Sequence, residues 1–162
     1  MTKVAVVTGS NKGIGLSIVR LLCKQFNGDV YLTSRNDERG HAAVKLLEGE
    51  GLKPKYHQLD IESAESVQAL YDDIMKDYGG VDILVNNAGV FFLDSDTRPF
   101  SDKVDTTMNI NFTSTRHMTE KFFPVMKPNG RMVIVSSELG TLGKYTLLSS
   151  DCLFLVTEVY QG

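Results

Sequence analysis

Three glycines near the start of the chain have a spacing that suits phosphate binding. They lie in the segment Thr8-Gly9-Ser10-Asn11-Lys12-Gly13-Ile14-Gly15, between a short β-branched run and a run with helical spacing. In such a strand–loop–helix unit the glycines allow a sharp turn, a close approach of backbone N–H groups to a pyrophosphate, and close packing of the helix on the sheet. The start of the helix adds unpaired N–H groups and the positive end of its dipole. The pattern predicts a dinucleotide site. The alternative is a glycine-rich turn without a ligand.

Two cations indicate which dinucleotide this loop would hold. A site for NAD places Asp or Glu about 20 residues after the loop, at the end of the second strand. In this sequence Thr33-Ser34-Arg35 stands at that place, without an acid. The guanidinium of Arg35 and the ammonium of Lys12 suit a 2′-phosphate. We therefore predict NADP(H) rather than NAD(H). The alternative is that both cations are solvated surface residues.

Two polar side chains further along the chain are candidates for contact with a substrate. Within residues 101–126, apolar side chains recur at three or four residues and form one face, on which Asn111 also lies. We expect Asn111 to point inward from that face, where a buried amide needs hydrogen-bond partners. Ser137 follows a strand at its carboxyl end, where ligands of doubly wound sheets bind. The alternatives are a structural Asn111 bonded to nearby backbone and a Ser137 that forms a turn or caps a helix.

Strand-like and helical patterns alternate along the chain. The sheet that they predict would bring the candidate site residues together. Expected strands are 4–8, 29–34, 55–59, 81–85 and 131–135, and expected helices are 14–26, 37–50, 63–78 and 101–126, the last broken near Pro124. Gly79-Gly80 stops the third helix, and Lys127-Pro128-Asn129-Gly130 reads as a turn. This alternation indicates βαβ units. It predicts an α/β fold with a doubly wound parallel sheet and helices on both faces.

Composition excludes several classes of protein. The chain has 162 residues, a net charge of −3 and 42% hydrophobic residues, as in one globular domain. Its pI of about 5.6 and the lack of a basic run argue against a nucleic-acid partner. His41, His57 and His117 are too scattered for a metal site, and Cys23 and Cys152 are expected to be reduced.

No apolar run reaches the ~18 residues of a membrane helix. The first strand begins too early for a signal peptide, so we expect a cytoplasmic protein without a membrane partner.

The glycine loop together with Asn86-Asn87-Ala88-Gly89 after the fourth strand resembles the short-chain dehydrogenase/reductase family. The resemblance covers roughly residues 3 to 138. Further features are similar to the NADPH-dependent carbonyl reductase branch: Asn11-Lys12, Arg35, Gly79-Gly80 and the turn through Lys127-Pro128-Asn129-Gly130-Arg131. The resemblance implies a Rossmann fold, NADP(H), and reduction of small carbonyl compounds such as ketones, aldehydes and quinones.

The resemblance also implies roles for single residues. The loop residues Gly9, Asn11, Gly13, Ile14 and Gly15 would hold the pyrophosphate, and Lys12 and Arg35 the 2′-phosphate. Asp60 and Ile61 would lie beside the adenine, and Asn87, Ala88 and Gly89 near the cofactor ribose. Ser137 would donate a hydrogen bond to the substrate carbonyl, and Asn111 would belong to a proton relay.

The sequence departs from the family's pattern after Ser137. In the family a Tyr-x-x-x-Lys motif supplies the proton for the nascent alkoxide, because the lysine charge lowers the tyrosine pKa. Here Tyr145 is followed four residues later by Ser149. We therefore expect a Rossmann domain at 1–138, with C-terminal strands missing, and a divergent tail of the same domain at 139–162. The alternative function is a catalytically inactive NADP(H)-binding module.

Missing strands would leave the edge of the fifth strand open. We expect either a monomer or self-association through that edge. The tail, which contains a strand-like piece at 153–156, is a candidate to cover it.

Overall fold

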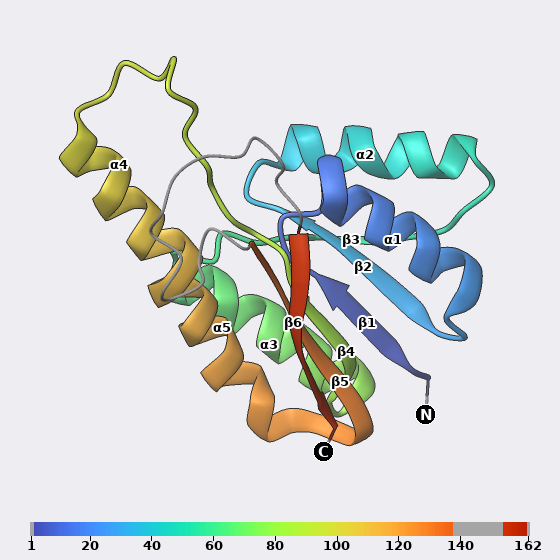
Figure 1. Cartoon of the computed structure of the whole chain (residues 1–162). Coiled ribbons are helices and arrows are strands. Elements are labelled where there is room, and N and C mark those ends of the chain that lie inside the picture. Colours follow the sequence, from blue (N-terminus) through green and yellow to red (C-terminus); the bar gives the residue numbers. More distant parts are fainter. Residues whose placement is uncertain (1, 138–153, 162) are drawn as a thin grey trace.

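The sheet has the strand order of a doubly wound fold. The computed structural model describes residues 2–137 and 154–161. Its strands are β1 (Val4–Val7), β2 (Asp29–Ser34), β3 (Lys55–Gln58), β4 (Val81–Asn86), β5 (Met126–Ser137) and β6 (Phe154–Gln161). Their order is β3-β2-β1-β4-β5-β6 (Figure 1). Strands β1 to β5 pair in parallel. The strand order reverses between β1 and β4, which confirms the predicted doubly wound α/β fold.

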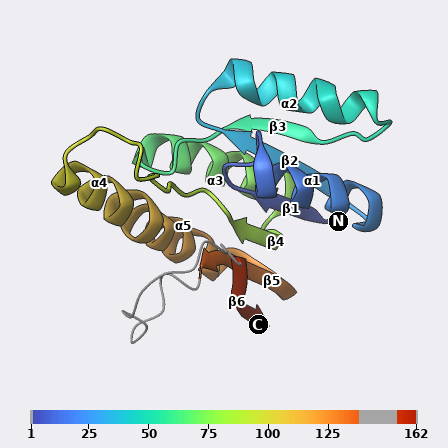
Figure 2. The same cartoon turned by 45° about the horizontal axis from the view of Figure 1, so that its top comes forward.

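Helices cover both faces of this sheet (Figure 2). They are α1 (Gly13–Gln25), α2 (Asp37–Gly49), α3 (Ala64–Tyr78), α4 (Phe100–Thr107), the π-helical η1 (Met108–Ser114), α5 (Thr115–Phe122) and the 3₁₀ turn η2 (Phe123–Val125). Helices α1 and α2 pack on one face, and α3 and α5 pack on the other. The side chains of β1 alternate between the two resulting cores, with Val4 and Val6 in one and Ala5 and Val7 in the other.

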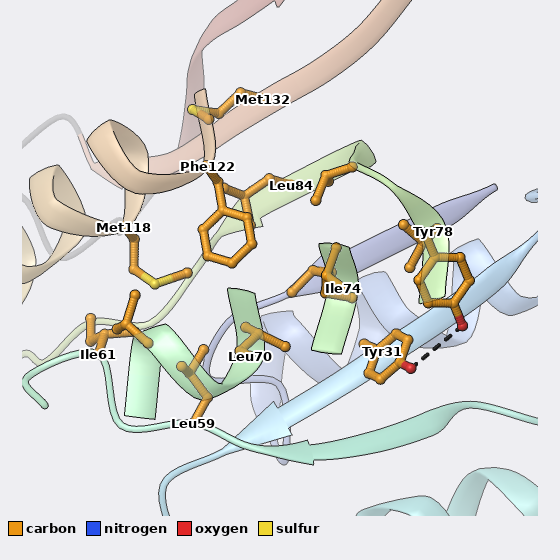
Figure 3. Packing of buried hydrophobic residues seen from close by; sticks show 14 of the residues in the cluster. Tyr31, Leu59, Ile61, Leu70, Ile74, Tyr78, Leu84, Met118, Phe122 and Met132 are labelled. Carbon is orange, nitrogen blue, oxygen red and sulfur yellow. Dashed lines mark hydrogen bonds between the residues drawn. The ribbon is translucent and has the colours of Figure 1, made fainter. Parts of the chain in front are cut away.

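The larger core lies between the sheet and helices α3 and α5 (Figure 3). Phe122 and Met118 from α5 and Leu70 and Ile74 from α3 are all fully buried there. At its far end the rings of Tyr31 and Tyr78 meet edge-on, with centroids 6.0 Å apart. Because both faces are covered, the strands can be apolar without a polar alternation.

Short polar side chains fix where α2 and α3 begin. The side chain of Asn36 accepts a hydrogen bond from the N–H of Arg39, and that of Ser63 accepts from the N–H of Ser66. Such caps satisfy N–H groups that have no partner within the helix. Gly79 ends α3 in the left-handed conformation, with φ of 69°, so the predicted stop at Gly79-Gly80 is confirmed.

The segment expected to be one helix at 101–126 is divided by η1. The wider π-helical turn changes which side chains face the sheet. Asn111 is exposed, and Met108 on the expected inner face is 53% exposed. The prediction that Asn111 points inward is therefore wrong, because it assumed one helical period along the whole segment. Met118 and Phe122 on the expected face are buried as predicted, whereas Ile110 and Ser114 are buried in the π-helical turn.

The predicted turn at 127–130 lies inside β5 as a bulge. Val81 pairs with Met126 and Ile83 with Arg131, so several additional residues of β5 loop out between the two pairs. Asn129 lies in this bulge with φ of 63°, a left-handed conformation that Asn tolerates. The fifth strand is therefore longer than the expected 131–135.

Strand β6 of the tail covers the edge of β5. It pairs antiparallel to β5, with Met132 opposite Tyr160 and Ser137 opposite Phe154. This confirms the prediction that the tail is the segment that covers the edge. Tyr145 and Ser149 lie outside the described residues.

Candidate functional site

The loop between β1 and α1 is fastened to the end of β4 by Thr8. Its Oγ1 accepts hydrogen bonds from the backbone N–H groups of Asn87 and Ala88, both at 2.9 Å. In return, Asn87 Nδ2 donates to the carbonyls of Thr8, at 2.9 Å, and Gly9, at 3.1 Å. Thr8 is 1% exposed, so losing these bonds would leave buried polar groups without partners. The structure thus brings the glycine loop and the segment after β4 together.

Ser10 fastens the same loop to β2. Its Oγ donates to the carbonyl of Val7 at 2.8 Å and accepts from the N–H of Thr33 at 2.9 Å. The hydroxyl of Thr33 also donates to Val7 O, at 3.0 Å. These roles of Thr8, Ser10 and Thr33 were not predicted from the sequence. For Thr8 and Thr33 the available signal was a hydroxyl residue directly after an apolar run, where backbone groups leave the sheet and need partners.

The loop glycines are required for two different reasons. A Cβ on Gly9 would lie 2.8 Å from Ala88 Cα, and one on Gly15 would lie 2.7 Å from Ser10 Cα. Gly9 and Gly13 have φ of 60° and 58°, which side chains rarely adopt. A Cβ on Gly13 would meet nothing within 4 Å, so the space beside it is open.

The start of α1 is free to bind an anion. Helices α2 and α3 have side-chain caps and acidic residues in their first turns, whereas α1 has neither. Its first N–H groups therefore lack both helical partners and a side-chain acceptor. Lys12 stands at the N-cap position with an exposed side chain, and Ile14 is 37% exposed. Half-buried Asn11 precedes them. These donors and the space beside Gly13 fit the phosphates of a dinucleotide.

Arg35, Asp60 and Ile61 stand together beyond the ends of the neighbouring strands β2 and β3. The side chain of Arg35 is 59% exposed, and its Nη1 lies 4.0 Å from Glu62 Oε2. Asp60 Oδ1 accepts from the N–H of Glu62 at 3.1 Å, and Ile61 is 9% exposed. Gln58 Nε2 donates to the backbone carbonyl of Arg35, which joins the two strand ends.

Asn111 clamps the segment that follows Gly89. Its Oδ1 accepts from the N–H of Val90 and its Nδ2 donates to the carbonyl of Val90, both at 2.8 Å. A Cβ on Gly89 would lie 3.2 Å from Asn111 Oδ1, which is closer than most real Cβ contacts. These bonds are those of a structural asparagine held by nearby backbone, the alternative that the sequence left open.

A hollow of about 390 Å³ lies beside this clamp, between Lys12 and the loop after β4. Phe91, Phe92 and Leu93 line it, together with Asp96 and Arg98. The guanidinium of Arg98 donates to Asp96 at 3.0 and 2.7 Å and lies 4.2 Å from the ring centroid of Phe92. These hydrogen bonds lower the pKa of Asp96 to about 2, so its carboxylate stays charged into more acidic solution than an ordinary aspartate.

Ser137 is the last residue of β5 and is half-buried. It therefore lies at the same carboxyl edge as the glycine loop and the end of β4. Asn86 has a different position from Asn87, since it is buried and its Nδ2 donates to Thr119 Oγ1 on α5 at 3.2 Å. Of the two asparagines in the motif, Asn87 is the one that contacts the loop.

None of the helices in the described part of the chain has the length and apolar character of a membrane span. Over 2–137 and 154–161, no three His, Cys, Asp or Glu side chains gather in a way that could hold a metal ion.

Curated relatives match most of this chain. Carbonyl reductase [NADPH] 3 of Rattus norvegicus is 51% identical over 139 residues, which are 86% of this chain and 50% of the relative. Carbonyl reductase [NADPH] 1 of Homo sapiens is 54% identical over 134 residues, 83% of this chain and 48% of the relative. The chain thus spans about half the length of the curated relatives it matches.

Solved structures share the fold. Menthone neomenthol reductase from Mentha piperita superposes with a TM-score of 0.77 at 28% identity, covering 88% of this chain and 62% of that one. A metagenomic short-chain oxidoreductase in complex with NADP gives 0.73 at 28% identity, covering 90% and 65%. The family model for short chain dehydrogenases matches residues 3–149. The chain therefore belongs to the short-chain dehydrogenase/reductase family.

Proposed function

We propose that this chain binds NADP(H) at the carboxyl edge of its sheet. The observation that carries the proposal is the uncapped start of α1 beside a loop in which Gly9 and Gly15 leave no room for side chains and Gly13 faces open space. Lys12 and Arg35 supply two exposed cations, and no acid occupies the end of β2. Residues Gly9 to Gly15 would hold the pyrophosphate, Lys12 and Arg35 the 2′-phosphate, and Asp60 and Ile61 the adenine. Asn87, Ala88 and Gly89 would border the ribose.

We further propose that the bound cofactor serves the reduction of small carbonyl compounds such as ketones, aldehydes or quinones. The curated relatives carry NADPH and carbonyl reductase in their names. When bound, the cofactor supplies a hydride. Ser137 would donate a hydrogen bond to the substrate carbonyl, which favours the charge that develops on its oxygen. Asn111 would take part in proton delivery while its amide orders Val90. A cytoplasmic location and a domain at 1–138 with its tail at 139–162 belong to the same proposal.

A second candidate is cofactor binding without turnover. It is favoured by the sequence after Ser137, where Tyr145 lacks a lysine four residues on. Without that pair, no lysine charge at that spacing lowers the pKa of the tyrosine that would donate the proton. Both candidate functions need the same NADP(H) site, so cofactor binding and turnover must be measured separately.

Titration of the purified chain with NADPH, followed by cofactor fluorescence, tests the binding. NADH is the comparison, and the absence of tryptophan keeps protein emission low. We expect saturable binding that prefers NADPH. Arg35→Ala should weaken NADPH binding and leave NADH binding nearly unchanged. Arg39→Ala, which removes an exposed cation on α2, is the matched control. Equal binding of both nucleotides, or loss of both in Arg35→Ala, would contradict the 2′-phosphate assignment.

Turnover separates the two candidates. Oxidation of NADPH in the presence of a reactive quinone, at a rate above that without protein, would support the reductase. Saturable binding without such oxidation would support the binding module.

A further inference from the structure

Glu62 connects the cation at the end of β2 with the π-helical segment on the other side of the site. Its Oε2 lies 4.0 Å from Arg35 Nη1, and its Oε1 accepts a hydrogen bond from Asn109 Nδ2 at 2.6 Å. Arg35 follows β2, Glu62 follows β3 and Asn109 belongs to η1. Three segments distant in the sequence thus meet at one carboxylate.

The position of Glu62 is fixed rather than free. Asp60 Oδ1 accepts from the backbone N–H of Glu62 at 3.1 Å, which sets the direction of the chain there. Asn109 holds one carboxylate oxygen, and the side chain is 33% exposed, against 59% for Arg35. The carboxylate is therefore the less exposed member of the pair and has a second partner. The guanidinium is the member that is more accessible to an incoming anion.

We propose that Glu62 sets the preference between NADPH and NADH by sharing Arg35 with the 2′-phosphate. This inference rests on the proposed function, since it needs a 2′-phosphate that Arg35 contacts. The negative charge of Glu62 offsets part of the electrostatic attraction between Arg35 and that phosphate. NADH has no phosphate at this place, so the charge of Glu62 affects its binding little. Glu62 is a specificity-determining residue in this account and takes no part in the reaction.

The sign of the effect follows from charge. Glu62→Gln keeps the shape of the side chain and its acceptor oxygen for Asn109 but removes the negative charge. We expect NADPH to bind about two- to five-fold more tightly and NADH unchanged, because exposed ion pairs have small energies. Added salt should reduce the gain, since salt screens exposed charges.

The experiment is a fluorescence titration of four proteins with both nucleotides: the unaltered chain, Glu62→Gln, Arg35→Ala and the double variant. The gain from Glu62→Gln should shrink by at least half in the Arg35→Ala background, since contacting residues are coupled. Glu48→Gln, which removes an exposed acid at the far end of α2, is the matched control for net charge and should change neither affinity.

Three results would overturn the inference while leaving the proposed function intact. These are an unchanged preference in Glu62→Gln, an equal gain for NADH, and the same gain with and without Arg35. If the unaltered chain shows no preference for NADPH, the proposed function fails, and the inference fails with it. Far-ultraviolet circular dichroism of each variant distinguishes a loss of nucleotide binding from a loss of the fold.

Discussion

Thr8 and Asn87 each hold the backbone of the other. The Thr8 hydroxyl accepts from the Asn87 N–H at 2.9 Å, and the Asn87 amide donates to the Thr8 carbonyl at 2.9 Å. This exchange joins the end of β1 to the segment after β4, across the point where the strand order reverses. A ligand held by the glycine loop is thereby held against β4 as well.

Removing the Thr8 hydroxyl should destabilise the fold. Thr8→Val keeps the shape but leaves the half-buried N–H groups of Asn87 and Ala88 without their acceptor. We expect the free energy of unfolding in urea to fall by about 1–3 kcal/mol. Thr8→Ser, which keeps the acceptor, should lose less. Equal losses in the two variants would show that the methyl group, not the hydroxyl, matters.

Gly9 and Gly13 allow the cost of backbone strain to be compared with the cost of a steric clash. Both have positive φ, so alanine at either position should cost about 1–2 kcal/mol of stability through backbone strain. Gly9→Ala should cost more, because its Cβ would lie 2.8 Å from Ala88 Cα. Gly13→Ala should leave a stable fold but weaken NADPH binding, since its Cβ enters the open space at the start of α1. Thermal unfolding and cofactor titration measure the two effects separately. A folded Gly13→Ala variant with full affinity would argue against phosphates beside Gly13.

The Asn111 clamp should act locally. Asn111→Ala removes both bonds to Val90, so amide exchange at Val90 and in the next few residues should accelerate. Because Asn111 is exposed, global stability should fall by less than about 1 kcal/mol. Asn109→Ala, on the same π-helical segment but bonded to Glu62, should leave exchange at Val90 unchanged.

The Asp96–Arg98 pair should make the loop after β4 sensitive to strong acid. The side-chain and backbone hydrogen bonds from Arg98 lower the Asp96 pKa from its ordinary 3.8 to about 2. A lowered folded-state pKa means that the pair stabilises the loop above pH 3.8 and that this support is lost as the pH falls through about 2. Carboxyl chemical shifts should place the Asp96 midpoint there. In Arg98→Gln the midpoint should move back toward 3.8, and an unmoved midpoint would mean that Arg98 does not cause the shift.

Strand β6 should protect the edge of β5. Deletion of residues 138–162 removes the partner of Met132, Val133 and Val135, so their amides should exchange faster. An exposed edge also favours pairing between chains. The shortened chain should therefore associate with rising concentration in analytical ultracentrifugation. Amides of β1, which lies between β2 and β4, are the internal control. Slow exchange in β5 that survives the deletion would contradict this role of the tail.

The parallel sheet, the starts of α2 and α3 and the position of the glycine loop could be predicted from the sequence. Each of these depends on local chemistry: β-branched runs, capping side chains such as Asn36 and Ser63, and glycines where no Cβ fits. These signals are contained in a few consecutive residues, so they can be predicted without knowing what lies nearby.

The partners of Asn111, the place of the turn at 127–130 and the cover of β5 depend on how the elements pack. Asn111 lies in the π-helical turn and bonds to the backbone of Val90, and pairing with β4 turns Asn129 and its neighbours into a bulge. The fastening of the loop by Thr8 and the contact of Arg35 with Glu62 likewise join residues distant in sequence. Such features depend on which backbone and side-chain groups come close together when the elements pack. A pattern of neighbouring residues in the sequence does not specify those partners.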